Sequence, residues 1–251
     1  MQRAPFKFSV LTSMLLAAAF FTSVQSRADS ESIEPFTATY AASYRGMEAG
    51  NLTFTFKRAD QPDQFIYETT ADPSFLASLV VSRAAVERSI LSIDADGVKP
   101  LEWKLDDGKS GDKADGTLSF DWSSNRVTGR IEREAIDFPT QAGLQDRLSI
   151  QIAVMAALLR GEEPGTIPMI DDNRVKHYTY SKTGTATLET PLGKIETVIY
   201  ESTREGSSRV ARFWMAPAHD FIPMRAEQER KGKVETVMVI KALVRGDEVI
   251  K

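Results

Sequence analysis

One stretch of this chain has the pattern of a helix, and nearly all of the remaining sequence has the pattern of β-strands. Residues 145–161 read QDRLSIQIAVMAALLRG. Their apolar side chains fall on almost every face of a helix, which is typical of a buried helix. The apolar part is shorter than the roughly 20 residues that cross a bilayer. The sequence therefore predicts one buried central helix, over 146–160, around which the rest of the chain folds.

The residues at both ends of this stretch favour a helix that starts and stops there. Asp146 precedes the apolar run, where its carboxylate can accept hydrogen bonds from the free N–H groups of the first turn. Arg160 lies in the last turn, and Gly161 can adopt the left-handed conformation that ends many helices. From the cap alone, Asp146→Ala should cost about 1 kcal/mol of stability.

On either side of the helix, apolar and polar residues alternate with a period of two, as in half-buried strands. Turns rich in Gly, Pro, Asn and Asp separate these runs, which favours antiparallel neighbours over a βαβ fold. A short helix is expected near 74–82, either as a plug in the core or as a lid over a cavity. The expected strands are 36–44, 52–57, 65–70, 85–93, 101–105, 117–122 and 126–132 before the central helix, and 175–181, 185–189, 194–201, 210–215, 224–230 and 234–244 after it.

This pattern predicts a mainly β fold. We expect a curved antiparallel sheet of about 11 to 13 strands, half-barrel or barrel-like, wrapped around the one buried helix. Gly184 is expected to form a hairpin-type turn within it. No linker, low-complexity segment or internal repeat divides the chain after residue 28, so 29–251 is interpreted as a single domain.

The first 28 residues have the pattern of a secretory signal peptide. Arg3 and Lys7 form a basic start, 10–24 is mostly apolar, and small residues precede a cleavage position after Ala28. The alternative is an uncleaved anchor helix, for which the apolar run is short. We therefore expect an exported protein, periplasmic in a Gram-negative cell, with no stable membrane span after cleavage. The chain has no cysteine, so neither a disulfide nor a lipid-modified cysteine is expected.

Charge limits the class of partner. Removing residues 1–28 takes the net charge from −4 to −7, because that segment holds three basic residues and no acid. An acidic chain argues against nucleic acid, and against an anionic membrane surface, as the main partner. A lipid or another hydrophobic ligand, and an envelope protein, remain as candidate partners.

Motifs for catalysis and for metal binding were sought and not found. The two histidines, His177 and His219, have no second histidine at metal-binding spacing. No phosphate-binding glycine loop or nucleophile elbow occurs. The loop 106–112 is rich in Asp but lacks the closing glutamate of a calcium loop, so it is interpreted as a hairpin tip. We expect no metal, no cofactor and no catalytic residue, and a non-enzymatic protein.

Aromatic and aliphatic side chains gather on one face of many of the predicted strands. Such a face either packs as a core filled by the central helix or leaves room for an apolar, lipid-like ligand. The sequence leaves both open. The candidate ligand-binding residues are Tyr44, Phe54, Phe56, Phe65, Tyr67, Leu76 and Leu79.

Three groups of residues carry a resemblance to a known family. They are YRGMEAG at 44–50, DRLS at 146–149, and Trp214 followed by Asp220, Ile222 and Pro223. With them the chain resembles the exported bacterial proteins of domain-of-unknown-function family 3108. The resemblance implies a periplasmic, mostly antiparallel β protein with no established activity. It also implies a distant fold-level similarity to the half-barrel carriers of lipoproteins.

Each of these motif residues also has a structural explanation. Gly46 and Gly50 suit a turn with positive φ, and Asp146 with Ser149 suits a helix cap. Trp214 is expected in a buried strand and Asp220 in the loop 217–220 that follows it, and Pro223 is expected to keep the start of the next strand out of the ladder.

Three hypotheses for function follow. The first is a periplasmic, non-enzymatic envelope protein that binds an apolar ligand within the curved sheet. The second is a protein-interaction or regulatory module with a fully packed core, whose exposed sheet edge pairs with a partner. The third is a carboxylate-dependent hydrolase, for which Asp146 and Asp220 are the candidates. A cavity of several hundred cubic ångströms would support the first, and a filled core would favour the second.

Overall fold

The computed structural model describes residues 33–250 except 80, 112–113 and 247. The predicted signal peptide, 1–28, lies outside the described residues. In the described part, fifteen strands form one antiparallel sheet around one α-helix, α1 (Ser149–Leu159), with two short 3-10 turns, η1 (Ala77–Leu79) and η2 (Pro217–His219). The strands are β1 Phe36–Tyr44, β2 Met47–Arg58, β3 Gln64–Pro73, β4 Val86–Asp94, β5 Gly97–Asp106, β6 Gly116–Asp121, β7 Arg126–Ile131, β8 Glu134–Pro139, β9 Thr166–Asp171, β10 Arg174–Thr190, β11 Gly193–Thr203, β12 Arg209–Ala216, β13 Ile222–Arg230, β14 Lys233–Arg245 and β15 Glu248–Ile250.

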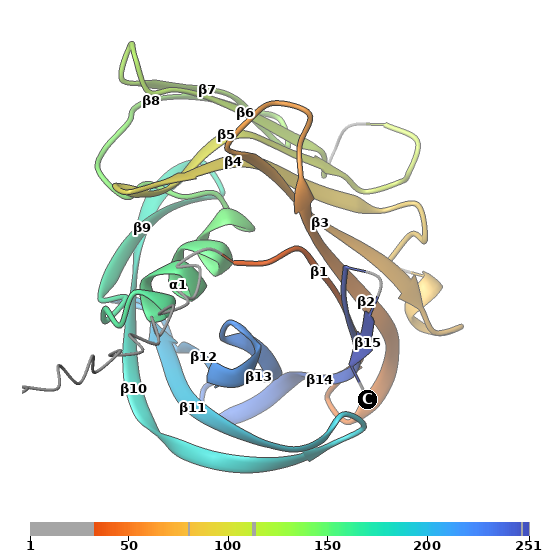
Figure 1. Cartoon of the computed structure of the whole chain (residues 1–251). Coiled ribbons are helices and arrows are strands. Elements are labelled where there is room, and N and C mark those ends of the chain that lie inside the picture. The colour runs from red at the N-terminus through yellow and green to blue at the C-terminus, as the bar shows by residue number, and fades with distance from the viewer. Residues whose placement is uncertain (1–32, 80, 112–113, 247, 251) are drawn as a thin grey trace, which may run out of the picture.

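The sheet consists of two meanders that meet in its middle. The chain starts at β1, runs outward strand by strand to β8, crosses through α1 to β9, and returns to β14, which pairs with β1. The strands β8 and β9 are the two ends of this path, so the sheet curves but does not close by hydrogen bonds. Figure 1 shows α1 lying inside the curve of the sheet. The predicted fold class is therefore confirmed.

Alternation of residue type explains how the strands face the core. In β1, Phe36, Ala38 and Tyr40 are buried, while the intervening threonines face outward. Thr37 and Thr39 each form a hydroxyl hydrogen bond with a threonine of β2. Such cross-strand pairs add a fraction of a kilocalorie each, and they fix which face of the strand is buried.

Two clusters of buried side chains hold the curve together. The larger one surrounds α1 and reaches from β1–β4 to β10–β14. The smaller one joins β5–β8 to Leu144 and to Ile170 of β9. Side-chain packing therefore connects the two free ends of the sheet where no strand pairing does.

The polar cap and the glycine stop predicted for α1 are present, although the regular helix is shorter than the predicted 146–160: it begins at Ser149 and ends at Leu159, with Arg160 as its C-cap residue. The Asp146 carboxylate accepts the N–H groups of Leu148 and Ser149, both at 2.8 Å, and Ser149 Oγ accepts the N–H of Asp146 at 2.9 Å. This reciprocal pattern is a capping box, formed one turn ahead of the first regular helical residue. At the other end Gly161 has φ +71°, and the N–H of Glu162 donates to the carbonyl of Ala157, which completes a Schellman motif.

Some elements differ from the sequence-based expectation. The runs 175–181 and 185–189 form one strand, β10, and Gly184 marks a register shift within it rather than a turn. Three strands were not predicted: β8, β9 and β15. The expected helix near 74–82 is only the 3-10 turn η1, and it contains no buried residue, so it is not a core plug.

Candidate functional site

The candidate ligand-binding residues separate into a buried group and an exposed group. Phe54, Phe56, Phe65 and Tyr67 lie in the larger core, where their rings contact one another and the ring of Phe36. Phe56 stacks on Phe65 with ring centroids 5.0 Å apart. The Tyr67 hydroxyl donates to Gln151 Oε1 of α1 at 3.0 Å. These four side chains fill the space between the sheet and the helix.

The space left inside the curve is small. Two apolar cavities lie beside α1, of about 50 and about 20 Å³, and both are lined by Gln151, Phe213 and Pro223. Pockets for lipid-sized ligands usually measure several hundred cubic ångströms. In the described part of the chain, the interior beside α1 is thus essentially filled.

The exposed group belongs to a patch that we call the apolar rim. Phe75 is 82% exposed, Leu76 65% and Leu79 73%. These side chains project from the connection between β3 and β4, which Figure 1 shows as a short coil outside the ring of strands. The apolar rim consists of Tyr44, Met47, Phe75, Leu76, Leu79, Val81 and Val234.

Backbone contacts bring the three segments of the apolar rim together. Ser74 donates its N–H to the carbonyl of Ala49 at 3.0 Å and its hydroxyl to the carbonyl of Glu48 at 2.9 Å. Tyr44 at the end of β1 pairs with Thr236 of β14. The β3–β4 connection, the β1–β2 turn and the start of β14 therefore lie at the same end of the sheet. Exposed apolar patches on a folded protein usually mark a ligand, membrane or partner surface.

Cations border the apolar rim. Arg45 pairs with Glu235 at 2.6 Å, and Arg83 pairs with Asp72 at 3.4 Å. Lys231 lies in the turn between β13 and β14, and Lys233 is the first residue of β14, just before Val234. Apolar side chains bordered by Lys and Arg are the pattern with which peripheral proteins meet lipid, since the cations can reach phosphate groups.

The DRLS motif forms a second, buried cluster. Asp146 is fully buried and accepts, besides its two backbone partners, the hydroxyl of Ser89 on β4 at 2.6 Å. Burial raises the pKa of Asp146 to about 6, although the hydrogen bonds from Ser89, Ser149 and Leu148 oppose that shift. The carboxylate thus ties the helix start to the sheet.

The neighbouring residues reinforce this connection. Arg147 Nε donates to Glu87 Oε1 at 3.1 Å, and its guanidinium lies 4.9 Å from the centre of the Trp103 ring. Trp103 Nε1 donates to the same Glu87 oxygen at 2.9 Å. Gln145 Nε2 donates to the carbonyl of Val98 at 2.8 Å. Three consecutive side chains, Gln145, Asp146 and Arg147, therefore join the start of α1 to β4 and β5.

The partners of Asp146 and Arg147 on β4 were not predicted from the sequence. Ser89 occupies an inward position of β4, two residues before the buried Leu91. A serine in an inward register is a signal for a buried polar partner, because an unpaired buried hydroxyl is costly. That signal indicates a partner but not its identity, which depends on the fold.

The motif residues near Asp220 lie elsewhere. The Asp220 carboxylate accepts Arg245 Nη1 at 2.7 Å, and Pro223, the second residue of β13, accepts the Tyr40 hydroxyl at 2.8 Å. Asp146 and Asp220 thus belong to separate hydrogen-bond networks. The expectation of a buried Trp214 is wrong: it is half-buried, with the guanidinium of Arg225 5.4 Å from its ring centre.

The two glycines of the first motif have different roles. Gly46 has φ +79° in the tight turn between β1 and β2, and a side chain there would meet nothing within 4 Å. Gly50 lies inside β2 with φ +113°, and a Cβ there would lie 2.3 Å from the carbonyl oxygen of Asp72. Gly50 is therefore required by the close approach of β3, and not by a turn.

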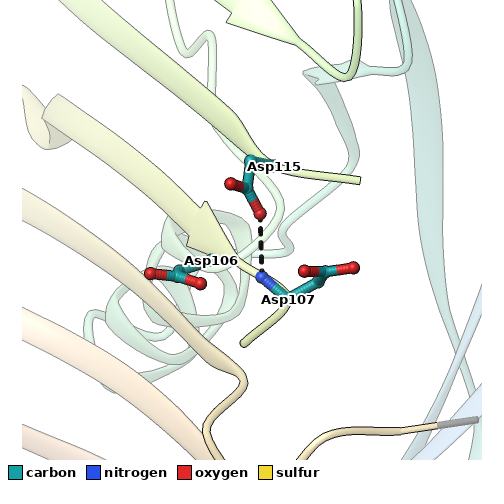
Figure 2. Close-up of side chains that lie close together, drawn as sticks. All are labelled: Asp106, Asp107 and Asp115. Carbon is teal, nitrogen blue, oxygen red and sulfur yellow. Dashed lines mark hydrogen bonds between the residues drawn. The ribbon is translucent and has the colours of Figure 1, made fainter. Parts of the chain in front are cut away.

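Three carboxylates come together at the end of β5 and in the loop that leads to β6. Oxygen atoms of Asp106, Asp107 and Asp115 lie within 4.8 Å of one another. Figure 2 shows Asp115 accepting the backbone N–H of Asp107. The Asp106 side chain lies to the left of this hydrogen bond and the Asp107 side chain to its right. Asp106 and Asp107 also accept the N–H groups of Gly108 and Lys109. These bonds are those of a hairpin tip.

The fold defines a β-barrel-like protein in which an open, curved antiparallel sheet encloses one helix. A family model described as protein of unknown function DUF3108 matches residues 39–238, and the chain belongs to that family. No helix within the described residues is long and apolar enough to cross a membrane.

One solved structure shares this fold: a β-barrel-like protein of the domain of unknown function DUF1849 from Brucella abortus. It is 11% identical, with a TM-score of 0.54, and the match covers 86% of this chain and 99% of that one. A candidate lipoprotein from Parabacteroides distasonis is 9% identical, with a TM-score of 0.35 over 84% of this chain and 95% of that one. Among curated proteins, no match was found.

Proposed function

We propose that this chain is an exported, non-enzymatic envelope protein that binds an apolar, lipid-like ligand at the apolar rim. The observation that carries this proposal is the exposure of Phe75, Leu76 and Leu79 in one short connection. Burying each such side chain against acyl chains is worth about 1.5–3 kcal/mol. The ligand is held at the end of the curved sheet, because the interior is filled by α1 and its aromatic neighbours.

Two features favour lipid over a protein partner at this surface. Four of the seven apolar side chains, Phe75, Leu76, Leu79 and Val81, belong to the β3–β4 connection, whose regular structure within the described residues is the three-residue η1. This connection forms a protrusion outside the ring of strands (Figure 1). Four cations border the protrusion, Arg45 and Arg83 in ion pairs with Glu235 and Asp72, and Lys231 and Lys233 beside them, although the chain as a whole is acidic. Apolar protrusions with basic borders suit entry into a lipid surface, where the cations meet phosphate groups.

The filled interior keeps the interaction module as a second candidate. A partner strand would need a free sheet edge, and β8 offers one at the end of the sheet path. That edge is short and carries Glu134, Asp137 and Pro139, which is how proteins prevent edge pairing. For an interaction module too, the apolar rim is a better contact surface than the edge of β8.

The test compares the whole protein with a variant carrying Phe75→Ser, Leu76→Ser and Leu79→Ser. Both are purified from the envelope of the source cell and analysed by native mass spectrometry and lipid extraction. We expect lipid bound to the parent protein and at least about tenfold less on the variant, because three buried side chains are lost. The melting temperature should stay the same, since the three side chains are exposed in the free protein.

A matched control keeps the apolar surface and changes only its shape: Phe75→Leu, Leu76→Met and Leu79→Met. This control should retain the lipid. A parent protein that carries no lipid and does not bind vesicles of phosphatidylethanolamine and phosphatidylglycerol would contradict the proposal. A co-purifying protein lost with the serine variant would favour the interaction module instead.

A further inference from the structure

A polar pocket opens at the same end of the sheet as the apolar rim, and we call it the mouth pocket. It has a volume of about 300 Å³ and lies where β9 and β11 end and where β10 and β12 begin. Four cations line it, Arg147, Lys176, Arg204 and Arg209, together with two acids, Asp171 and Asp172. Its charged residues thus carry a net positive charge in a chain whose overall charge is −4.

The mouth pocket adjoins the apolar interior along the inner face of the sheet. On β10, Lys176, Tyr178 and Tyr180 follow one another at every second position, and Tyr180 lines the smaller apolar cavity. On β12, Arg209 and Ala211 line the mouth pocket, whereas Phe213 lines both apolar cavities. The inner face of the sheet therefore changes from charged to apolar along its strands.

The two acids of the pocket share one ammonium group, which offsets one of their two negative charges. Lys176, whose side chain is 10% exposed, donates to Asp171 at 2.6 Å and to Asp172 at 2.7 Å. The Tyr178 hydroxyl also donates to Asp171, at 2.9 Å. This partly buried network fixes one wall of the pocket, since paired and hydrogen-bonded charges are held in place.

Arg204 and Arg209 remain available. In the described part of the chain neither forms an ion pair, although Arg209 is close enough to Glu235 to help lower the pKa of that carboxyl. Burial raises the pKa of the Tyr178 hydroxyl, and the positive charge of Arg204 opposes that rise. Arg204 therefore lies near the wall formed by Lys176 and Asp171. Two guanidinium groups beside an ammonium group form a donor set that suits phosphate.

We infer that the mouth pocket binds a phosphate group, held by Arg204 and Arg209 with Lys176 and Arg147 beside them. The phosphate could be free or could be the headgroup of a lipid, and the chemistry of recognition is the same. The inference does not depend on the proposed function, because none of these four residues belongs to the apolar rim.

The test uses the whole protein, the variant Arg204→Gln with Arg209→Gln, and a control of equal charge, Arg133→Gln with Lys182→Gln. The control residues are exposed cations outside the pocket. Inorganic phosphate is titrated by calorimetry at low salt, and vesicles of phosphatidylglycerol and of phosphatidylcholine are compared by flotation. We expect the pocket variant to bind about tenfold or more weakly, and the control to bind like the parent.

The two arms distinguish the source of the phosphate. Binding of inorganic phosphate that only the pocket variant loses supports a site for free phosphate. A preference for phosphatidylglycerol that only the pocket variant loses supports a lipid headgroup. Failure of the parent in both arms, or equal losses in the pocket variant and the control, would overturn the inference. If the protein carries no lipid but binds phosphate, that result contradicts the proposed function and leaves the phosphate site intact.

Discussion

At the scale of single residues, Asp146 carries the most information. The sequence predicts it as a helix cap, and it is one, but it is also fully buried against Ser89. Its loss would remove two backbone hydrogen bonds and leave the Ser89 hydroxyl without its acceptor. We therefore revise the expected cost of Asp146→Ala upward, from about 1 to about 3 kcal/mol. Urea unfolding measures this, and a cost near 1 kcal/mol would show that Ser89 finds another partner.

The titration of Asp146 gives a separate prediction. Burial raises the pKa of Asp146 from its ordinary value of 3.8 to about 6 in the folded protein, so the folded state binds the proton more tightly. This group therefore stabilises the fold most below pH 4, and its contribution falls as the pH rises to about 6, by about 3 kcal/mol. The variant Asp146→Asn cannot titrate there. Between pH 4 and pH 6.5 the stability of the parent should fall relative to that variant, as measured by urea unfolding at each pH; a constant difference would contradict the raised pKa.

At the scale of elements, the β2–β3 contact depends on Gly50. An Ala at this position combines an unfavourable φ with a Cβ placed 2.3 Å from a backbone oxygen. We expect Gly50→Ala to destabilise the protein by about 3 kcal/mol or more. Gly46→Ala is the matched control, since it has positive φ but open space, and should cost about 1 kcal/mol. Equal costs in urea unfolding would show that β3 moves away without penalty.

Strands in which apolar and polar residues alternate could be predicted from the sequence, and strands without this alternation could not. The strand β1 alternates and was expected with its observed bounds, whereas β9 has four consecutive buried residues, Ile167–Ile170, and so lacks a period of two. The strand β8 is short and ends in a proline. The exposure of η1 was also missed, because Leu76 and Leu79 have helical spacing that is typical of burial.

At the scale of the whole molecule, two long-range features organise the fold. The pairing of β1 with β14 joins the meanders, and the DRLS cluster anchors α1 to β4 and β5. The sequence indicates a sheet around a helix, since both patterns are local. It contains no local signal for which strands meet across about 200 residues, or for which charged side chains gather at the mouth pocket.

The central claim is that an apolar ligand contacts the rim and does not enter the interior. Hydrogen–deuterium exchange with and without vesicles of phosphatidylethanolamine and phosphatidylglycerol tests it directly. We predict that lipid slows exchange in 74–79 and in the β1–β2 turn, and leaves α1 unchanged, because α1 is already buried. Altered exchange in α1 and in the strands around Phe54 and Phe213, with the β3–β4 connection unchanged, would contradict the claim and place the ligand inside the curved sheet.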